Sequence, residues 1–210
     1  MVQLPPGRLT QWIVGVTAAV WAVLALAGWS DQAAVMGGFI PARFAGLIRL
    51  ADGVPMWLTP FTATLLHANL LHLGFNMLML LFCGRFVESA IGPLMLALLY
   101  ILGAFASAFA QYLPEPASVV PMIGASGAIS AIVGAYAVLF SQQKVKAIGP
   151  FSPFVVRVVW LAAAWIVVQI LMGLATFGTM TRVAIAAHIG GFLAGLVLAR
   201  PMLLWRYRSA

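Results

Sequence analysis

The sequence predicts an all-α membrane protein in which six helices cross the bilayer. Of the 210 residues, 64% are hydrophobic and only 7% are charged. A soluble domain of this length carries roughly 25% charged residues, so the chain has too little polar surface to be dissolved by water alone. Six apolar stretches are each long enough to cross about 30 Å of hydrocarbon as a helix. We therefore expect one membrane domain over residues 1–210.

The six predicted spans are joined by mostly short connections. Their approximate bounds are 12–29, 61–87, 91–113, 123–141, 154–176 and 182–203. Only Arg8 precedes the first apolar stretch, which is longer than the apolar part of a signal peptide, so we expect an uncleaved span. The longest connection, residues 30–60, mixes apolar side chains with Arg43 and Arg49. Such a mixture predicts a segment that lies in the membrane interface.

The basic residues predict that both termini face the cytoplasm, because cytoplasmic connections are enriched in lysine and arginine. With the N-terminus inside, the outer segments hold three basic residues, namely Arg43, Arg49 and Arg182. The inner segments then hold eight, namely Arg8, Arg85, Lys144, Lys146, Arg157, Arg200, Arg206 and Arg208. This placement explains the net charge of +7 as a topology signal and argues against a nucleic-acid partner.

The second predicted span holds three polar residues, His67, His72 and Asn76. Polar groups inside a membrane are costly and are default candidates for function. His72 and Asn76 are four residues apart and so share one helix face. His67 would lie at a neighbouring position on the same helix. Hydrogen bonding between helices is an equally good explanation for this span taken alone.

The fourth predicted span begins near Ser126, which is bracketed by Gly124 and Gly127. Glycine permits close backbone approach. A helix N-terminus also leaves backbone N–H groups free to face a developing oxyanion. The alternative is a packing face, because small residues continue along the span.

The sixth predicted span carries His188 within a stripe of small residues, Ala187, Gly191 and Gly195. Such a stripe allows close packing against the small face of the fourth span. Close packing would bring His188 within hydrogen-bond reach of Ser126, as a serine nucleophile requires from its base.

The three spans place His72, Asn76, Ser126 and His188 at the same depth, in the outer third of the membrane. Their chemistries are complementary, because a nucleophile, a base and two hydrogen-bond donors are what acyl transfer needs. The chain has only four acidic residues, and none lies in a span near His188. We therefore expect a Ser126–His188 dyad, with a group other than an acid orienting the imidazole.

At these residues the sequence resembles the rhomboid intramembrane serine proteases. The segment His67-Ala-Asn-Leu-Leu-His72-Leu-Gly-Phe-Asn76 is similar to the second-span motif of that family. Gly124-Ala-Ser126-Gly127 is similar to its nucleophile motif, and Ala187-His188-Ile189-Gly190-Gly191 to the motif of its base. Glu88 also matches a family carboxylate that follows the second span.

The resemblance implies a rhomboid-like six-helix bundle and a division of labour among these residues. Ser126 would be the nucleophile and His188 the general base. His72, Asn76 and the backbone N–H of Ser126 would form the oxyanion hole, with His67, Gly124 and Gly127 in support. No cofactor or metal is implied. Substrates would be single-span membrane proteins within the lipid bilayer, and the expected location is a bacterial cytoplasmic (inner) membrane.

Two positions depart from the family pattern. Ser130 stands where many members have an aromatic residue that packs against the base. Either another group fixes His188, or Ser130 bonds to it directly. The first outer loop has Ala42-Arg43 in place of the Trp-Arg pair that many members share.

Three other readings of the polar residues are weaker. A non-catalytic relative that binds membrane-protein clients would typically lack the serine or the histidine. A channel or transporter with a histidine relay would need polar groups in the inner halves of the spans, which are almost wholly apolar. Zinc held by His67, His72 and His188 is disfavoured, because a five-residue gap lacks the i, i+4 pairing of the two-histidine helical motif.

Overall fold

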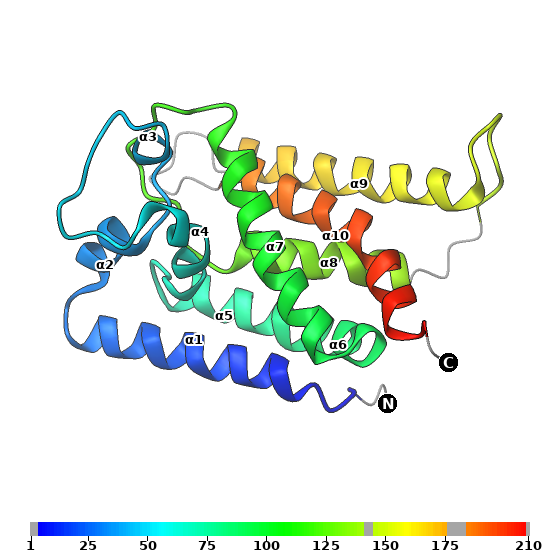
Figure 1. Ribbon diagram of the computed structural model, residues 1–210, viewed down its shortest axis with the longest axis horizontal. Coiled ribbons are helices and arrows are strands. Elements are labelled where there is room, and N and C mark those ends of the chain that lie inside the picture. The colour runs from blue at the N-terminus through cyan, green and yellow to red at the C-terminus, as the bar shows by residue number, and fades with distance from the viewer. Residues whose placement is uncertain (1–3, 141–144, 176–183, 209–210) are drawn as a thin grey trace.

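The computed structural model describes residues 4–140, 145–175 and 184–208, and the regular elements of this part of the chain are helices (Figure 1). The long helical segments are α1 (Arg8–Leu26), the run α5–η3–α6 (Leu70–Met79, Leu80–Gly84, Arg85–Ile91), α7 (Pro93–Tyr112), α8 (Ser126–Phe140), α9 (Pro153–Ala175) and α10 (Ile185–Arg206). Five of them are long and apolar enough to cross a membrane, and α8 is a shorter apolar helix of 15 residues. The prediction of an all-α membrane bundle is confirmed.

Short helices fill the long first connection. They are α2 (Ser30–Gly37), α3 (Pro41–Phe44), η1 (Met56–Leu58), α4 (Thr59–Thr62) and η2 (Ala63–Leu65). They gather at the end of the bundle where α1 ends, around the entry to α5 and α8 (Figure 1). The ends predicted at residues 141, 176 and 182, and the residues Lys144 and Arg182 of the topology argument, lie outside the described residues.

The predicted start of the second span is wrong. The helix begins at Leu70 rather than near residue 61, and it continues to Ile91. Asn69 is its N-cap, with an extended backbone and a side-chain oxygen that accepts a hydrogen bond from His72 N at 2.9 Å. Such a cap satisfies an N–H group that has no partner inside the helix. His67 therefore precedes the helix and does not share its face with His72.

The core is built on close contact between α8 and its neighbours α7 and α10. At Gly195 an added Cβ would collide with the carbonyl oxygen of Ala131, and at Gly134 with that of Phe192. Each glycine thus lets one helix backbone rest on the other, as the small-residue stripe predicts. Large buried side chains, including Leu96, Leu99 and Ile132, complete the packing.

A second set of contacts ties together the end of the bundle that carries both termini. The Glu88 carboxylate accepts hydrogen bonds from Leu9 N at 3.0 Å and from Thr10 N at 2.8 Å, and so caps the start of α1. Charged caps of this kind complement the positive end of a helix. Arg206 of α10 donates to the carbonyl of Ser89 at 2.5 Å. α1, α6 and α10 are therefore joined at this end.

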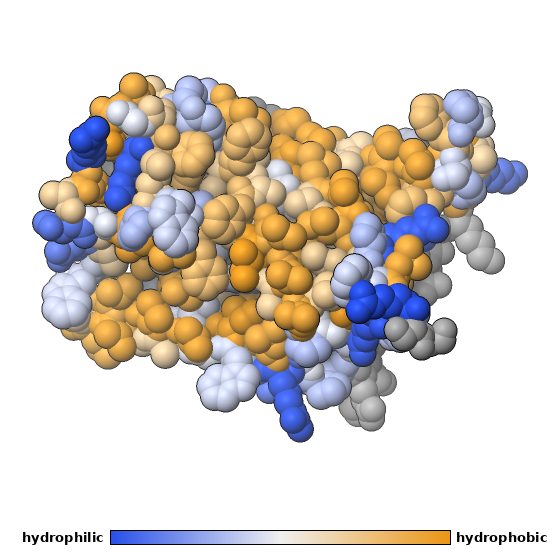
Figure 2. Space-filling view, in the orientation of Figure 1, coloured by the Kyte–Doolittle hydropathy of each residue, from blue (hydrophilic) through white to orange (hydrophobic). Residues whose placement is uncertain are grey.

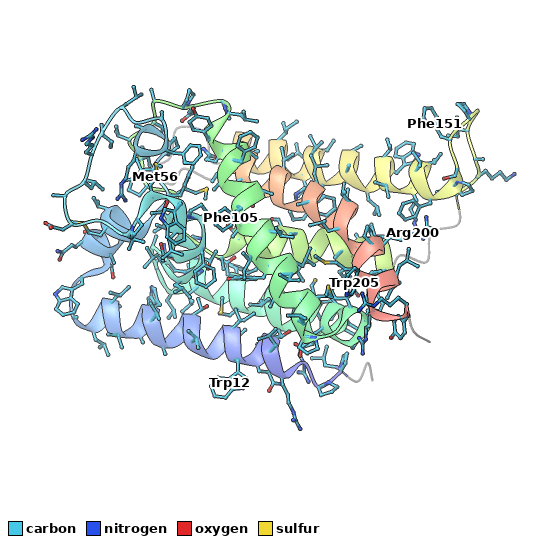
Figure 3. All side chains as sticks on the ribbon, viewed as in Figure 1. Trp12, Met56, Phe105, Phe151, Arg200 and Trp205 are labelled. Atoms are coloured by element: carbon cyan, nitrogen blue, oxygen red, sulfur yellow. The ribbon has the colours of Figure 1, made fainter. Side chains whose placement is uncertain are left out.

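The outer surface is that of a membrane protein. Figure 2 shows a mostly apolar face, with hydrophilic residues mainly toward its two ends. Trp12 and Trp205 project outward near the end that carries the termini and are 73% and 57% exposed (Figure 3). Trp29, just before α2, and Trp57, in η1, are also exposed and belong to the short helices at the opposite end of the bundle (Figure 1). Tryptophan favours the membrane–water interface, so these residues fit two interfacial belts.

Candidate active site

Ser126 is the first residue of α8, and the extended segment before it is held by the first connection. Phe39 and Met122 exchange two backbone hydrogen bonds, of 3.0 and 2.8 Å, and form an isolated antiparallel bridge. Gly124 N then donates to the carbonyl of Ala63 at 2.8 Å. The position of Ser126 is therefore fixed from both sides, by the α8 helix and by the paired segment.

Gly124 brings the imidazole of His72 against the backbone next to Ser126. Its φ is +113°, a conformation that residues with a side chain rarely adopt. A Cβ at this position would lie 2.7 Å from Cε1 and Nε2 of His72. The structure thus places His72 beside the segment that precedes Ser126, where the sequence predicts an oxyanion donor.

His188 lies in the first turn of α10 and faces Ser126. Its Nε2 is 2.8 Å from Ser126 Oγ. The approach depends on Gly191, where a Cβ would collide with the carbonyl oxygen of Gly127. A hydroxyl at this distance from an imidazole nitrogen can transfer its proton as it attacks an electrophile.

The other ring nitrogen of His188 faces a residue that the sequence analysis did not select. Nδ1 of His188 is 3.0 Å from Oε1 of Gln169, on α9. Trp165, one turn earlier on α9, donates to the His188 carbonyl at 3.4 Å and stacks on Phe192. Gln169 is a polar residue in an otherwise apolar part of its helix, which is the signal that could have identified it.

Ser130 does not bond to His188. Its hydroxyl donates to the carbonyl of Ser126 at 2.8 Å, one turn back in its own helix. The structure therefore favours the first alternative from the sequence, in which a group other than Ser130 contacts His188.

His67 and Asn76 occupy supporting positions. His67 Nε2 accepts a hydrogen bond from Ala125 N at 3.4 Å, and its ring meets the ring of His72 edge-on at 5.0 Å. Asn76 is buried one turn beyond His72, and its amide donates to the His72 carbonyl at 2.9 Å. His67 therefore contacts the backbone next to Ser126, and Asn76 is bonded to His72 within α5.

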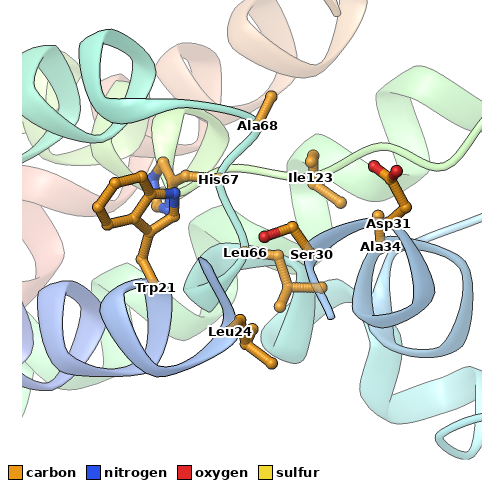
Figure 4. Close-up of a pocket in the computed structure, with 9 residues that line it drawn as sticks. All are labelled: Trp21, Leu24, Ser30, Asp31, Ala34, Leu66, His67, Ala68 and Ile123. Atoms are coloured by element: carbon orange, nitrogen blue, oxygen red, sulfur yellow. The ribbon is translucent and has the colours of Figure 1, made fainter. Parts of the chain in front are cut away.

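A small cavity of about 100 Å³ adjoins His67 between the ends of α1 and α2. Its lining consists of Trp21, Leu24, Ser30, Asp31, Ala34, Leu66, His67, Ala68 and Ile123. In Figure 4, Trp21 and His67 lie together on one side and Asp31 lies on the other. The cavity is large enough for water and has polar groups at its edge, as a water site requires.

Comparisons with known proteins match most of the chain to one family. Residues 55–205 match the family model described as the rhomboid domain. RHOMBOID-like protein 4 of Arabidopsis thaliana is 31% identical over 139 residues, which cover 66% of this chain and 32% of that protein. Rhomboid-like protein 11, chloroplastic, of the same plant is 31% identical over 180 residues, covering 82% and 61%.

A yeast protein matches as well. Rhomboid protein 1, mitochondrial, of Saccharomyces cerevisiae is 29% identical over 141 residues, covering 62% of this chain and 38% of that protein. The chain thus spans about a third of the length of RHOMBOID-like protein 4 and of a second Arabidopsis relative, RHOMBOID-like protein 1. Because the family model covers well over half of the residues, this chain belongs to the rhomboid family of integral membrane proteins.

Proposed function

We propose that this chain is a serine endopeptidase that hydrolyses peptide bonds in or near the transmembrane helices of other membrane proteins. The observation that carries the proposal is the 2.8 Å separation of Ser126 Oγ and His188 Nε2. Membership of a family that includes intramembrane proteases supports it.

The reaction follows from the roles of these two groups. Ser126 Oγ attacks the carbonyl carbon of the scissile bond, and its proton passes to His188 Nε2. The tetrahedral intermediate collapses by breaking the C–N bond, and His188 gives the proton to the leaving amine. Water, deprotonated by His188, then attacks the acyl-serine ester. The C–O bond to Ser126 breaks, His188 returns the proton to Ser126 Oγ, and the new carboxylic acid leaves.

The oxyanion of the intermediate requires hydrogen-bond donors. The backbone N–H of Ser126 has no acceptor within its own helix, because it belongs to the first turn. The His72 imidazole, held against Gly124, is the second donor in the proposal, and the Asn76 amide is the third. Removing one such donor typically lowers kcat by about 100- to 1,000-fold.

Hydrolysis also needs water, which the hydrocarbon core of a bilayer lacks. The cavity beside His67 and the exposed Asn69 before α5 provide polar surface at the end of the bundle that holds the dyad. Their position supports a role for His67 in holding water close to the ester.

The proposed substrates are single-span membrane proteins. Their helices protect each carbonyl by an internal hydrogen bond, so the scissile segment must unwind before Ser126 reaches it. We expect cleavage of a reporter to slow as glycine and proline near the site are replaced by leucine. An unchanged rate across such a series would show that unwinding does not govern substrate choice.

The chain is an integral membrane protein, and the membrane in which it resides is a matter of proposal. The names of two relatives place those proteins in the chloroplast and the mitochondrion. These names do not support the bacterial cytoplasmic membrane that the sequence predicts. They also give no support to the predicted cytoplasmic orientation of the termini.

Cleavage of a single-span reporter by the purified protein in liposomes tests the proposed function. Wild type is compared with Ser126→Ala, His188→Ala and the control Ser89→Ala, an exposed serine outside the site. The proposal predicts cleavage by wild type and the control alone. Equal cleavage by Ser126→Ala would refute it. Binding of the reporter without any cleavage would favour the non-catalytic client binder.

A further inference from the structure

Gln169 is buried in a helix that otherwise faces lipid at this level. It is 2% exposed, whereas its neighbours Val168 and Ile170 are 49% and 50% exposed. A buried amide is costly unless its polar atoms have partners. The partner of its Oε1 is His188 Nδ1, at 3.0 Å. Its burial and this contact together indicate that the Gln169 side chain is a hydrogen-bond partner of the His188 imidazole.

The contact determines where the imidazole proton lies. A carbonyl oxygen can only accept a hydrogen bond, so Gln169 Oε1 requires the proton on His188 Nδ1. In the neutral ring, Nε2 then carries the lone pair, and Nε2 is the atom 2.8 Å from Ser126 Oγ. The opposite tautomer would point an N–H at the serine and could not take its proton.

The described part of the chain offers His188 no carboxylate for this purpose. Glu88 lies at the far end of the bundle, where it caps α1. Ser130 is bonded to the Ser126 carbonyl. Within the described residues, the side-chain partners of His188 are Ser126 and Gln169 alone.

We propose that Gln169 is the positioning residue of the base. It selects the Nδ1–H tautomer of His188 and aligns the ring, and it stabilises the imidazolium that forms when Ser126 gives up its proton. In serine hydrolases with a triad a carboxylate performs these tasks. The inference rests on the proposed function for its catalytic consequence, but the tautomer itself can be observed without any substrate.

The first measurement is the protonation pattern of His188 by nitrogen NMR. The chain has only three histidines, so ¹⁵N-histidine labelling gives signals from three imidazoles. The signals that disappear in His188→Ala are those of His188. We expect wild type to show the Nδ1–H tautomer at His188, and Gln169→Leu to lose this preference. An Nε2–H tautomer in wild type, or an unchanged pattern in Gln169→Leu, would overturn the proposal whether or not the protein cleaves anything.

The second measurement is the cleavage rate of the single-span reporter in liposomes. Gln169→Leu keeps the volume but removes the acceptor, and we expect kcat to fall about 10- to 100-fold with KM unchanged. Gln169→Glu restores an acceptor and has no amide donor, so it should retain most of the wild-type kcat. Gln11→Leu, the same change at an exposed position of α1, is the control and should leave kcat unaltered.

These variants separate the two claims. If wild type cleaves and folded Gln169→Leu cleaves equally well, the positioning role fails and the dyad stands. If folded Gln169→Glu is as impaired as Gln169→Leu, the amide N–H is required and the acceptor role is wrong. If wild type itself cleaves nothing and Ser126 takes up no serine-directed reagent, the proposed function fails, and the NMR pattern alone decides the role of Gln169.

Discussion

The α8–α10 pair and α9 both contribute to the site, but they are held in different ways. α8 and α10 meet through glycine contacts that leave no room for a Cβ on either side, and they carry Ser126 and His188. α9 packs chiefly against α10 and turns most of its length outward, with Trp160 66% and Leu171 60% exposed. The two residues of the proposed dyad thus lie on two closely packed helices, and Gln169, which we propose orients the base, lies on a peripheral one.

The difference has a chemical consequence. The separation of the helix backbones that carry Ser126 and His188 is set by close contacts between α8 and α10. The Nδ1 partner of His188 is present only while α9 is docked on α10. If Gln169 orients the His188 ring as we propose, the competence of His188 as a base depends on how α9 is docked on α10, whereas the backbone separation of α8 and α10 does not.

The largest effect is expected at the entry to α8. Gly124→Ala places a methyl group against the His72 ring and strains a backbone at φ +113°. Displacement of Ser126 by about 1 Å should lower kcat about 100-fold. The control is Gly46→Ala, which has a φ of +75° but nothing within 4 Å of the added Cβ. The rate of reporter cleavage is measured for both variants. Equal rates for Gly124→Ala and Gly46→Ala would show that the His72 contact does not position Ser126.

The packing of α8 on α10 is tested at Gly195. Gly195→Ala would drive a methyl group into the carbonyl of Ala131, and we expect a loss of about 1–3 kcal/mol in unfolding free energy. Gly74→Ala on α5 meets nothing within 4 Å, so it should instead gain about 0.5–1 kcal/mol from helix propensity. Unfolding titrations in mixed micelles measure the two values. The same sign for both variants would contradict the backbone contact.

The smallest of these effects is expected at Trp165 of α9. Trp165→Phe keeps an aromatic ring on Phe192 but removes the hydrogen bond to the His188 carbonyl, and kcat should fall about 2- to 10-fold. Trp160→Phe, the same change on the exposed face of α9, is the control. Reporter kinetics in liposomes compare them. A loss in the control as large as in Trp165→Phe would mean that α9 acts through its general packing.

The sequence predicted much of this architecture because its signals are local. Apolar length identified the spans, and the small residues around Gly195 predicted the close approach of α8 and α10 that the structure shows. The start of the second span was wrong because residues 61–69 are apolar enough to continue a helix. The N-cap of Asn69 and the short turns before it decide the boundary, and hydropathy does not register them.

Gln169 was missed for a different reason. Its relation to His188 spans 19 residues and two helices, and no sequence spacing links them. The sequence predicted that a group other than an acid orients His188, either Ser130 or another residue, and it did not identify the amide of Gln169 as that residue. A search of the spans for every polar side chain would have included Gln169, but only the packing of α9 on α10 shows which way it points.

Reaction of the folded protein with a fluorophosphonate tests the central claim most directly, because no substrate need be known. Ser126 Oγ would attack phosphorus and expel fluoride, and peptide mass spectrometry would locate the adduct. The account predicts a time-dependent adduct on Ser126 in wild type, none in Ser126→Ala, and a strongly slowed reaction in His188→Ala. An adduct on a different serine, or equal labelling of wild type and His188→Ala, would contradict it.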